Sequence, residues 1–217
     1  MRIYIDSADL EEITQALATG YVYGVTTNPT LLRRANVRVG SVPDLARKAL
    51  DVGAKELHLQ TYSAEADAIV REGTELAALD PKRVVVKIPA VPQGYVAAAR
   101  LAGQGVRVTM TAVYTVRQAL LADSVGAAYI AVYLGRMRDS GLDAMQLVGR
   151  MQRTLDTQGS HVEILAASVR APEEIEDLAE LGVATATLPW KVLSRLVESE
   201  ATEAAAATFL EDAEAIR

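Results

Sequence analysis

The sequence of 217 residues contains no cysteine and only two histidines. The lack of cysteine excludes disulfides, thiolate metal sites and cysteine nucleophiles. His58 and His161 lie far apart and without the spacing of metal ligands, so both are interpreted as structural. Nucleotide motifs are also missing, because the segment Gly103–Gly105 falls at the end of an expected helix and no Walker A pattern occurs. The sequence therefore predicts no metal and no cofactor.

Long apolar runs and excess positive charge are absent as well. No run approaches the roughly 20 apolar residues that span a bilayer, and no signal peptide is expected, since strand-like residues begin at Arg2 and an acid follows at Asp6. The chain has 22 basic and 28 acidic residues, a formal net charge of −6. An acidic surface repels phosphate backbones and anionic membranes, so neither is an expected partner. Together with the lack of cysteine, these features predict a cytoplasmic protein.

Short apolar segments alternate with longer amphipathic ones along the whole chain. The length suits one compact domain, residues 1–217, with half of the residues hydrophobic. Apolar segments such as V-V-V-K-I-P are typical of strands buried on both faces. Strands are expected at Arg2–Asp6, Gly24–Asn28, Glu56–Thr61, Val84–Pro89, Val106–Thr111, Tyr129–Leu134, Glu163–Ser168 and Ala184–Leu188. This order predicts an α/β fold, a single parallel (β/α)8 TIM barrel; the alternative is a doubly wound open sheet, which more often has about five or six strands.

The segments between the strands carry helix signals. Helices are expected at Ala64–Leu79, Gly94–Leu101, Val116–Val125, Gly141–Leu155 and Pro172–Leu181. Ser63 is a candidate cap for the first of these, and Pro172 opens the last. Glycines that end helices recur before the next strand, at Gly53, Gly105, Gly126, Gly159 and Gly182. The alanine- and glutamate-rich tail after Glu198 predicts an extra C-terminal helix used for oligomer contacts.

Polar residues stand at the ends of seven expected strands. In a barrel of this kind the active site lies where strands end and β–α loops begin, so these residues should share one mouth. They are Asp6; Thr26, Thr27 and Asn28; Gln60 and Thr61; Lys87; Thr109 and Thr111; Tyr133 and Arg136; and Ser168 and Arg170.

Lys87 is the most informative of these residues, because it interrupts an apolar strand. Burial disfavours the ammonium form of a lysine, and a neutral lysine attacks carbonyl groups to give an iminium. A lysine at this position is therefore a candidate Schiff-base nucleophile. The alternatives are a lysine whose amine reaches the solvent at the barrel mouth, or one paired with Asp6 or Glu56.

Arg136, Arg170 and Ser168 follow two neighbouring strands and form a candidate phosphate site, since guanidinium groups match phosphate oxygens. The alternative is that the arginines pair with Asp139 or Glu173 at the surface. A purely structural role is an alternative for the other strand-end residues as well. Asp6 could hold Lys87, the threonines and Asn28 could cap the turn before Pro29, and Gln60 and Tyr133 could bond to each other.

The motifs of the chain resemble the transaldolase family, in particular its small transaldolases and fructose-6-phosphate aldolases. The matching segments are Tyr4–Asp6 (Y-I-D), Gly24–Pro29 (G-V-T-T-N-P), Val85–Pro89 (V-V-K-I-P), Thr111–Tyr114 (T-A-V-Y), Tyr133–Arg136 (Y-L-G-R), Leu165–Ser168 (L-A-A-S) and Thr187–Pro189 (T-L-P). They occur in the family's order and cover nearly the whole chain.

The resemblance implies roles for these residues. Lys87 corresponds to the Schiff-base lysine, Asp6 and Asn28 to residues that bond substrate hydroxyls, with Thr26 beside them, and Arg136, Ser168 and Arg170 to the phosphate site. Gln60, Thr111 and Tyr133 correspond to the group that positions the catalytic water, with Tyr133 as acid–base. Transaldolases carry glutamate and phenylalanine at the positions of Gln60 and Tyr133, so this chain is closer to the aldolases. It departs from the family at Ala131–Tyr133, which lacks the usual proline.

The implied activity is that of a class I aldolase, which cleaves or forms fructose 6-phosphate from dihydroxyacetone and glyceraldehyde 3-phosphate. The alternatives are a transaldolase, which transfers a dihydroxyacetone unit between sugar phosphates, and a catalytically silent phosphate-binding barrel. The resemblance also implies a ring-forming homo-oligomer, a pentamer or a decamer.

Overall fold

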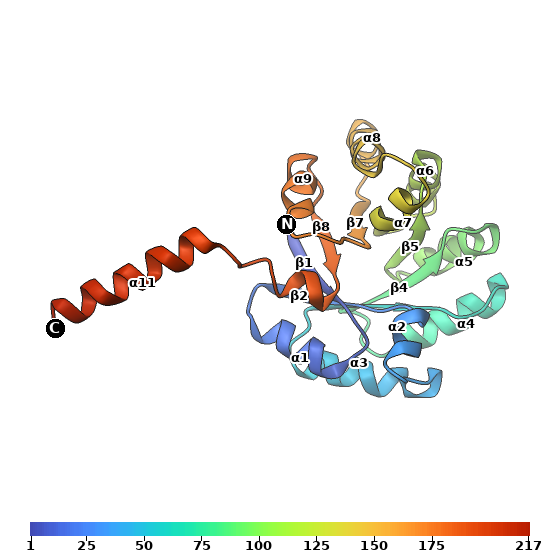
Figure 1. The fold of residues 1–217 in the computed structure, drawn as a ribbon. Coiled ribbons are helices and arrows are strands. Elements are labelled where there is room, and N and C mark those ends of the chain that lie inside the picture. The colour runs from blue at the N-terminus through green and yellow to red at the C-terminus, as the bar shows by residue number, and fades with distance from the viewer.

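Eight parallel strands close into a barrel in the order in which they occur in the sequence (Figure 1). The computed structural model describes residues 1–217. The strands are β1 (Arg2–Asp6), β2 (Val22–Thr26), β3 (Glu56–Gln60), β4 (Val84–Pro89), β5 (Val108–Val113), β6 (Tyr129–Tyr133), β7 (Glu163–Ala167) and β8 (Thr185–Leu188). The predicted (β/α)8 barrel is confirmed, and the open sheet is excluded because β1 pairs with both β2 and β8.

Helices surround the barrel (Figure 1). They are α1 (Leu10–Ala18), α2 (Pro29–Arg34), α3 (Val42–Asp51), α4 (Ala66–Ala77), α5 (Pro92–Gly103), α6 (Val116–Ser124), α7 (Leu134–Asp139), α8 (Ala144–Thr157), α9 (Glu174–Glu180), α10 (Trp190–Leu193) and α11 (Glu200–Ala215), with a 3-10 turn at Val39–Ser41. None of them is long and apolar enough to cross a membrane. The extra C-terminal helix is α11, which extends away from the barrel and leaves almost all its residues exposed.

Strand β4 shows how the sequence divides the core into two parts. Val84, Val86 and Ile88 belong to a cluster of 49 buried residues between the strands and the helices. Because successive side chains of a strand point to opposite faces, Val85 and Lys87 face the barrel interior. The burial of each such valine or isoleucine contributes about 1.5–3 kcal/mol. The outer cluster therefore holds the barrel closed, while the interior is free to carry polar residues.

Several predicted boundaries were wrong, each for a local reason. Strand β2 ends at Thr26 rather than Asn28, because Asn28 is the N-cap of α2 and accepts a hydrogen bond from the Leu31 amide. Strand β5 begins later than predicted and runs to Val113, since its register with β6 shifts where Ala112 has a φ of 59°.

The helices differ in a similar way. The segment predicted as Gly141–Leu155 is α8, which begins at Ala144, and the short helix α7 before it was not predicted. Ser63 does not cap α4; its hydroxyl donates to Glu72 instead, and α4 begins at Ala66. Helix α9 begins at Glu174 rather than at Pro172. The five glycines expected to end helices all have the positive φ that such ends require.

Candidate active site

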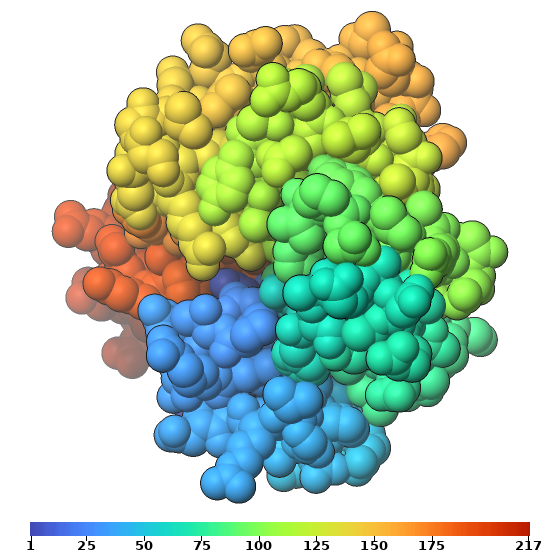
Figure 2. All heavy atoms as spheres, turned by 90° about the vertical axis from the view of Figure 1, so that its right-hand side faces the viewer, coloured from blue at the N-terminus to red at the C-terminus, as the bar shows by residue number.

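A cavity of about 360 Å³ opens at the carboxyl ends of the strands. In Figure 2 a hollow lies between the region of α2 (blue) and that of α7 (yellow), which both contribute to its lining. Seven predicted site residues line this cavity: Asp6, Asn28, Lys87, Tyr133, Arg136, Ser168 and Arg170. A larger open hollow, about 650 Å³, lies against α1 and α3 and contains none of them. The predicted convergence of these seven residues at one mouth is therefore present in the fold.

Lys87 is buried near the end of β4, with 2% of its surface exposed. Its Nζ donates one hydrogen bond, 3.0 Å long, to the backbone carbonyl of Thr27. It makes no ion pair, so the structure lacks the pairing with Asp6 or Glu56 that was the structural alternative. A buried amine with a single neutral partner keeps its remaining hydrogen-bonding capacity for the cavity that it lines.

Asp6 is oriented by a pair of threonines. The hydroxyl of Thr26 donates to Asp6 Oδ1 over 2.6 Å and lies 2.7 Å from the hydroxyl of Thr187. Thr26 is fully buried and does not line the cavity. It therefore acts on the site through Asp6, while Asn28 lines the cavity beside its capping bond to α2.

Tyr133 ends β6 and is held from two sides. Its hydroxyl lies 2.8 Å from the hydroxyl of Thr111, and its ring meets that of Tyr114 edge to face, with the two ring centroids 6.1 Å apart. The guanidinium of Arg136 lies 4.5 Å from the centre of the Tyr133 ring, a cation–π arrangement. Thr111 is buried behind the tyrosine and outside the cavity lining.

Gln60 is the predicted site residue with the least support from the geometry. It ends β3 directly beside Lys87 in the strand register, and it is half-buried. It does not line the cavity, and the hydrogen bond between Gln60 and Tyr133 that was considered above is not formed.

The arginine side of the cavity is built around a close approach of two loops. Ser168 has a φ of 59°, an uncommon conformation for a residue other than glycine, and its carbonyl accepts from the Gly135 amide over 3.0 Å. A Cβ on Gly135 would lie 2.5 Å from Arg170 Nε and 2.7 Å from Ser168 Oγ, so only glycine fits there. This approach places Arg136 beside Ser168 at the cavity wall.

The two arginines are not equivalent. Arg170 forms a two-pronged ion pair with Asp139, at 2.7 and 2.5 Å, which is one of the surface pairs considered from the sequence. The hydrogen bond from Arg170 lowers the pKa of Asp139. Arg136 has no carboxylate partner within ion-pair distance. The unpaired Arg136 is thus the more available cation for an anionic ligand.

Sequence reasoning missed part of the lining: Thr30, Leu31, Arg34, Asp139, Ala167, Val169 and Pro189. Arg34 is the important member, because it is an exposed cation without an ion-pair partner, contributed by α2, whereas Arg136 comes from α7. Its signal in the sequence is weak. The position becomes meaningful only once Pro29–Arg34 is known to form α2, which contributes Thr30, Leu31 and Arg34 to the cavity lining.

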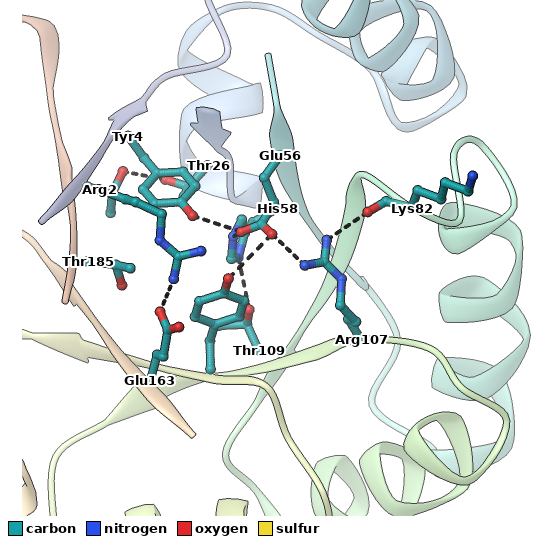
Figure 3. Close-up of polar contacts among 12 residues, drawn as sticks. Arg2, Tyr4, Thr26, Glu56, His58, Lys82, Arg107, Thr109, Glu163 and Thr185 are labelled. Carbon is teal, nitrogen blue, oxygen red and sulfur yellow. Dashed lines mark hydrogen bonds and ion pairs between the residues drawn. The ribbon is translucent and has the colours of Figure 1, made fainter. Parts of the chain in front are cut away.

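Below the cavity, a buried polar network fills the barrel interior (Figure 3). Glu56 accepts hydrogen bonds from Tyr4, Tyr129 and Arg107, and lies 2.9 Å from His58 Nε2. His58 is enclosed in this network, whereas His161 is exposed before β7. No group of three or more metal-ligating side chains occurs.

A closed parallel barrel with a polar cavity at the carboxyl ends of its strands is the architecture of (β/α)8-barrel enzymes. Comparisons with known proteins make the class more specific. The sequence model of the family described as "Transaldolase/Fructose-6-phosphate aldolase" matches residues 3–217. The chain therefore belongs to the transaldolase/fructose-6-phosphate aldolase family, and it is an enzyme of the class I aldolase or transaldolase type.

Curated relatives support the same membership. A "Probable transaldolase" of Herpetosiphon aurantiacus is 37% identical over 212 residues, which cover 98% of this chain and 94% of the relative. Another, from Thermus thermophilus, is 36% identical over 230 residues and covers both chains fully. A third, from Geobacillus thermodenitrificans, is 35% identical and covers 98% of each chain.

Solved structures of low identity support the fold alone. A flavocytochrome b2 variant with sulfite bound has a TM-score of 0.66 at 11% identity, covering 89% of this chain and 58% of that one. A mandelate oxidase variant has a TM-score of 0.63 at 13% identity, covering 91% and 68%.

Proposed function

We propose that this chain is a class I aldolase that cleaves or forms fructose 6-phosphate through a Schiff base on Lys87. The observation that carries the proposal is the state of this lysine: it is buried at the end of β4, lines the cavity and has no carboxylate counter-ion. A lysine amine that lines a cavity and has no carboxylate partner is free to attack the carbonyl carbon of a bound ketose and form an iminium.

In the proposed reaction, the neutral amine of Lys87 attacks C2 of the ketose phosphate, and loss of water gives an iminium. A base removes the proton of the C4 hydroxyl, the C3–C4 bond breaks, and the electron pair moves into the iminium to form an enamine. Glyceraldehyde 3-phosphate leaves. Protonation of the enamine at C3 and hydrolysis of the resulting iminium release dihydroxyacetone and regenerate Lys87. The iminium serves as the electron sink for bond cleavage.

We assign the acid–base role to Tyr133, acting through an ordered water. The phenol lines the cavity, and the hydroxyl of Thr111 at 2.8 Å fixes its orientation. Asp6, oriented by Thr26, and Asn28 are proposed to bond the substrate hydroxyls from the opposite wall. Gln60 lies next to Lys87 in the register, from where it would orient the water rather than touch the sugar.

The phosphate is proposed to bind between Arg136 and Ser168. Arg136 offers a guanidinium without a competing carboxylate. Arg170 also lines the cavity, but its guanidinium is paired with the carboxylate of Asp139. A charged contact to phosphate contributes about 1.5–3 kcal/mol.

Transaldolase is the second candidate, favoured by the names of the curated relatives. Aldolase is preferred because Gln60 and Tyr133 match the aldolase version of the family's motifs. An amide cannot shuttle a proton, whereas a phenol can. In a transaldolase the enamine must survive until an acceptor aldose arrives.

The deciding experiment incubates the enzyme with fructose 6-phosphate, with and without erythrose 4-phosphate. The measured quantity is the ratio of free dihydroxyacetone to sedoheptulose 7-phosphate, for the wild type and for Gln60→Glu. We expect release of dihydroxyacetone by the wild type and a shift toward transfer in the variant. A wild type that forms almost only the transfer product would establish the transaldolase instead, and one that does neither would leave a silent phosphate-binding barrel.

We also propose that the chain assembles into a homo-oligomer through α11. This helix extends from the barrel, and Phe209 and Leu210 on it are each 69% exposed. Large apolar side chains on a helix without a partner are typical of an interaction surface. A pentamer or decamer is the expected assembly.

A further inference from the structure

The interior of the barrel contains a hydrogen-bonded chain that the proposed reaction does not use (Figure 3). It begins at Arg107, whose Nη1 donates to Glu56 over 2.6 Å. Glu56 then meets His58 Nε2 at 2.9 Å, and His58 Nδ1 meets the hydroxyl of Thr109 at 2.9 Å. Glu56, His58 and Thr109 are all buried, with exposures of 2%, 0% and 0%.

The last link of this chain passes beneath Lys87. His58 lies on β3 and Thr109 on β5, while Lys87 lies on the strand between them. In the register, Lys87 pairs with Thr109 on one side and with Gln60, two residues beyond His58, on the other. The bond between His58 and Thr109 therefore crosses the inner face of β4 on the side of Lys87 that is away from the cavity. Glu56 lies beyond the imidazole, further from Lys87.

The charges along the chain follow from its contacts. Burial opposes the ionisation of Glu56, but the hydrogen bonds from His58 and Tyr4 and the charge of Arg107 together lower its pKa to about 2. Burial lowers the pKa of His58, and the charges of Lys87 and Arg107 lower it further, against the raising effect of Glu56. At neutral pH a carboxylate thus lies beneath an uncharged imidazole. Because a carboxylate can only accept, Nε2 of His58 carries the proton and Nδ1 accepts from Thr109.

We propose that His58 is a positioning residue that separates the buried carboxylate of Glu56 from the amine of Lys87. The inference rests on the proposed Schiff-base role of Lys87 and adds a reason for the histidine beneath it. The uncharged imidazole of His58 lies between the amine of Lys87 and the carboxylate of Glu56. It also donates a hydrogen bond to Glu56 from the side that faces Lys87.

Without this ring, Glu56 keeps Tyr4, Tyr129 and Arg107 as donors but loses its partner on the side of Lys87, and the lysine amine can take that vacated place. The lysine side chain has four rotatable bonds and one hydrogen bond to hold it, to Thr27. A salt bridge to Glu56 would stabilise the ammonium form and draw the amine away from the cavity. An opposite charge within about 4–6 Å raises the pKa of a lysine, and the shift of such groups is about 1–3 units.

The test measures how the labelling of Lys87 depends on pH. Folded protein is incubated with dihydroxyacetone and sodium cyanoborohydride between pH 5 and pH 10, and the labelled peptide is quantified by mass spectrometry. In His58→Ala, the pH of half-maximal labelling should rise by about one unit or more, and kcat at neutral pH should fall about tenfold or more. His58→Gln keeps bulk and a donor for Glu56, and it should retain the wild-type pH dependence.

A second-site variant separates this role from a purely structural one. Glu56→Gln in the His58→Ala background removes the competing carboxylate and should return the labelling midpoint to the wild-type value. Glu163→Gln, which removes a partly exposed carboxylate paired with Arg2, should not. A residue with only a structural role would show no such rescue, because the second substitution removes a further buried hydrogen bond.

The other titratable groups that face Lys87 stay in place in all these variants, so the shift can be assigned to Glu56. They are Asp6 from β1 and Tyr133 from β6 in the cavity, Arg136 from α7 at its wall, and Arg107 behind Glu56. If His58→Ala does not fold, His58→Val also removes the donor to Glu56 and is judged by the same criterion.

The possible failures are distinguishable. If the wild type is never labelled at Lys87, both the Schiff base on Lys87 and the positioning role of His58 are refuted. Three results in a protein that is labelled at Lys87 would overturn the role of His58 alone. They are an unchanged labelling midpoint in His58→Ala, no rescue of that variant by Glu56→Gln, and an equal shift of the midpoint in His58→Gln.

Discussion

Replacing Arg136 with alanine should weaken the binding of phosphorylated substrates while sparing the rest of the reaction. Arg136 is exposed at the cavity wall, makes no ion pair and contacts the face of Tyr133. Its removal therefore leaves no buried charge unpaired. The loss of one charged phosphate contact costs about 1.5–3 kcal/mol, or about 10–150-fold in binding. Because Arg170 is already held by Asp139, it is poorly placed to compensate.

The assay follows synthesis from dihydroxyacetone and glyceraldehyde 3-phosphate. We expect KM for the phosphorylated aldehyde to rise about 10–150-fold, with KM for dihydroxyacetone nearly unchanged. Arg117→Ala is the matched control, because Arg117 is an exposed arginine on α6 without an ion pair and outside the cavity. Equal losses for both substrates, or an effect as large in the control, would remove Arg136 from the phosphate site.

Three further predictions concern other parts of the molecule. Tyr133→Phe should lower the cleavage rate by about 10²–10⁴, the usual worth of a positioned acid–base group; a loss below threefold in kcat would refute the role of the phenol. Glu56 has a lowered pKa, so its stabilising effect is present above its unfolded pKa and is lost as pH falls from about 4.5 toward 2. Urea unfolding should show this loss in the wild type and a smaller one in Glu56→Gln, and equal slopes for both would contradict it. Deletion of the residues after Glu198 should reduce the particle mass seen by light scattering, whereas a full-length chain that is monomeric at micromolar concentration would exclude assembly through α11.

The sequence was sufficient for the barrel because its strands carry a strong and local signal. The segment V-V-V-K-I-P predicted β4 to the residue, since β-branched residues fill both faces and Pro89 ends the run. The end of β5 was not predictable in the same way. Its shift in register depends on pairing with β6 and on the positive φ of Ala112, which no local pattern indicates.

In the candidate site, too, the residues that were predicted have a local signal in the sequence, and those that were missed depend on the three-dimensional structure. Residues at strand ends, such as Asp6, Lys87 and Tyr133, were found because the topology of the barrel brings strand ends together. Arg34 was missed because its place at the mouth depends on a six-residue helix. The contact between His58 and Thr109 joins positions 51 residues apart in the sequence, and it becomes visible only in three dimensions.

The most direct test of the central claim is reductive trapping of the wild-type enzyme with fructose 6-phosphate and borohydride, followed by peptide mass analysis. We expect one labelled lysine, Lys87, with loss of turnover in proportion to labelling. We also expect that Lys87→Met folds normally, takes no label and is inactive. A folded Lys87→Met variant that keeps near-normal turnover, or a label on another lysine in the wild type, would contradict the Schiff base on Lys87.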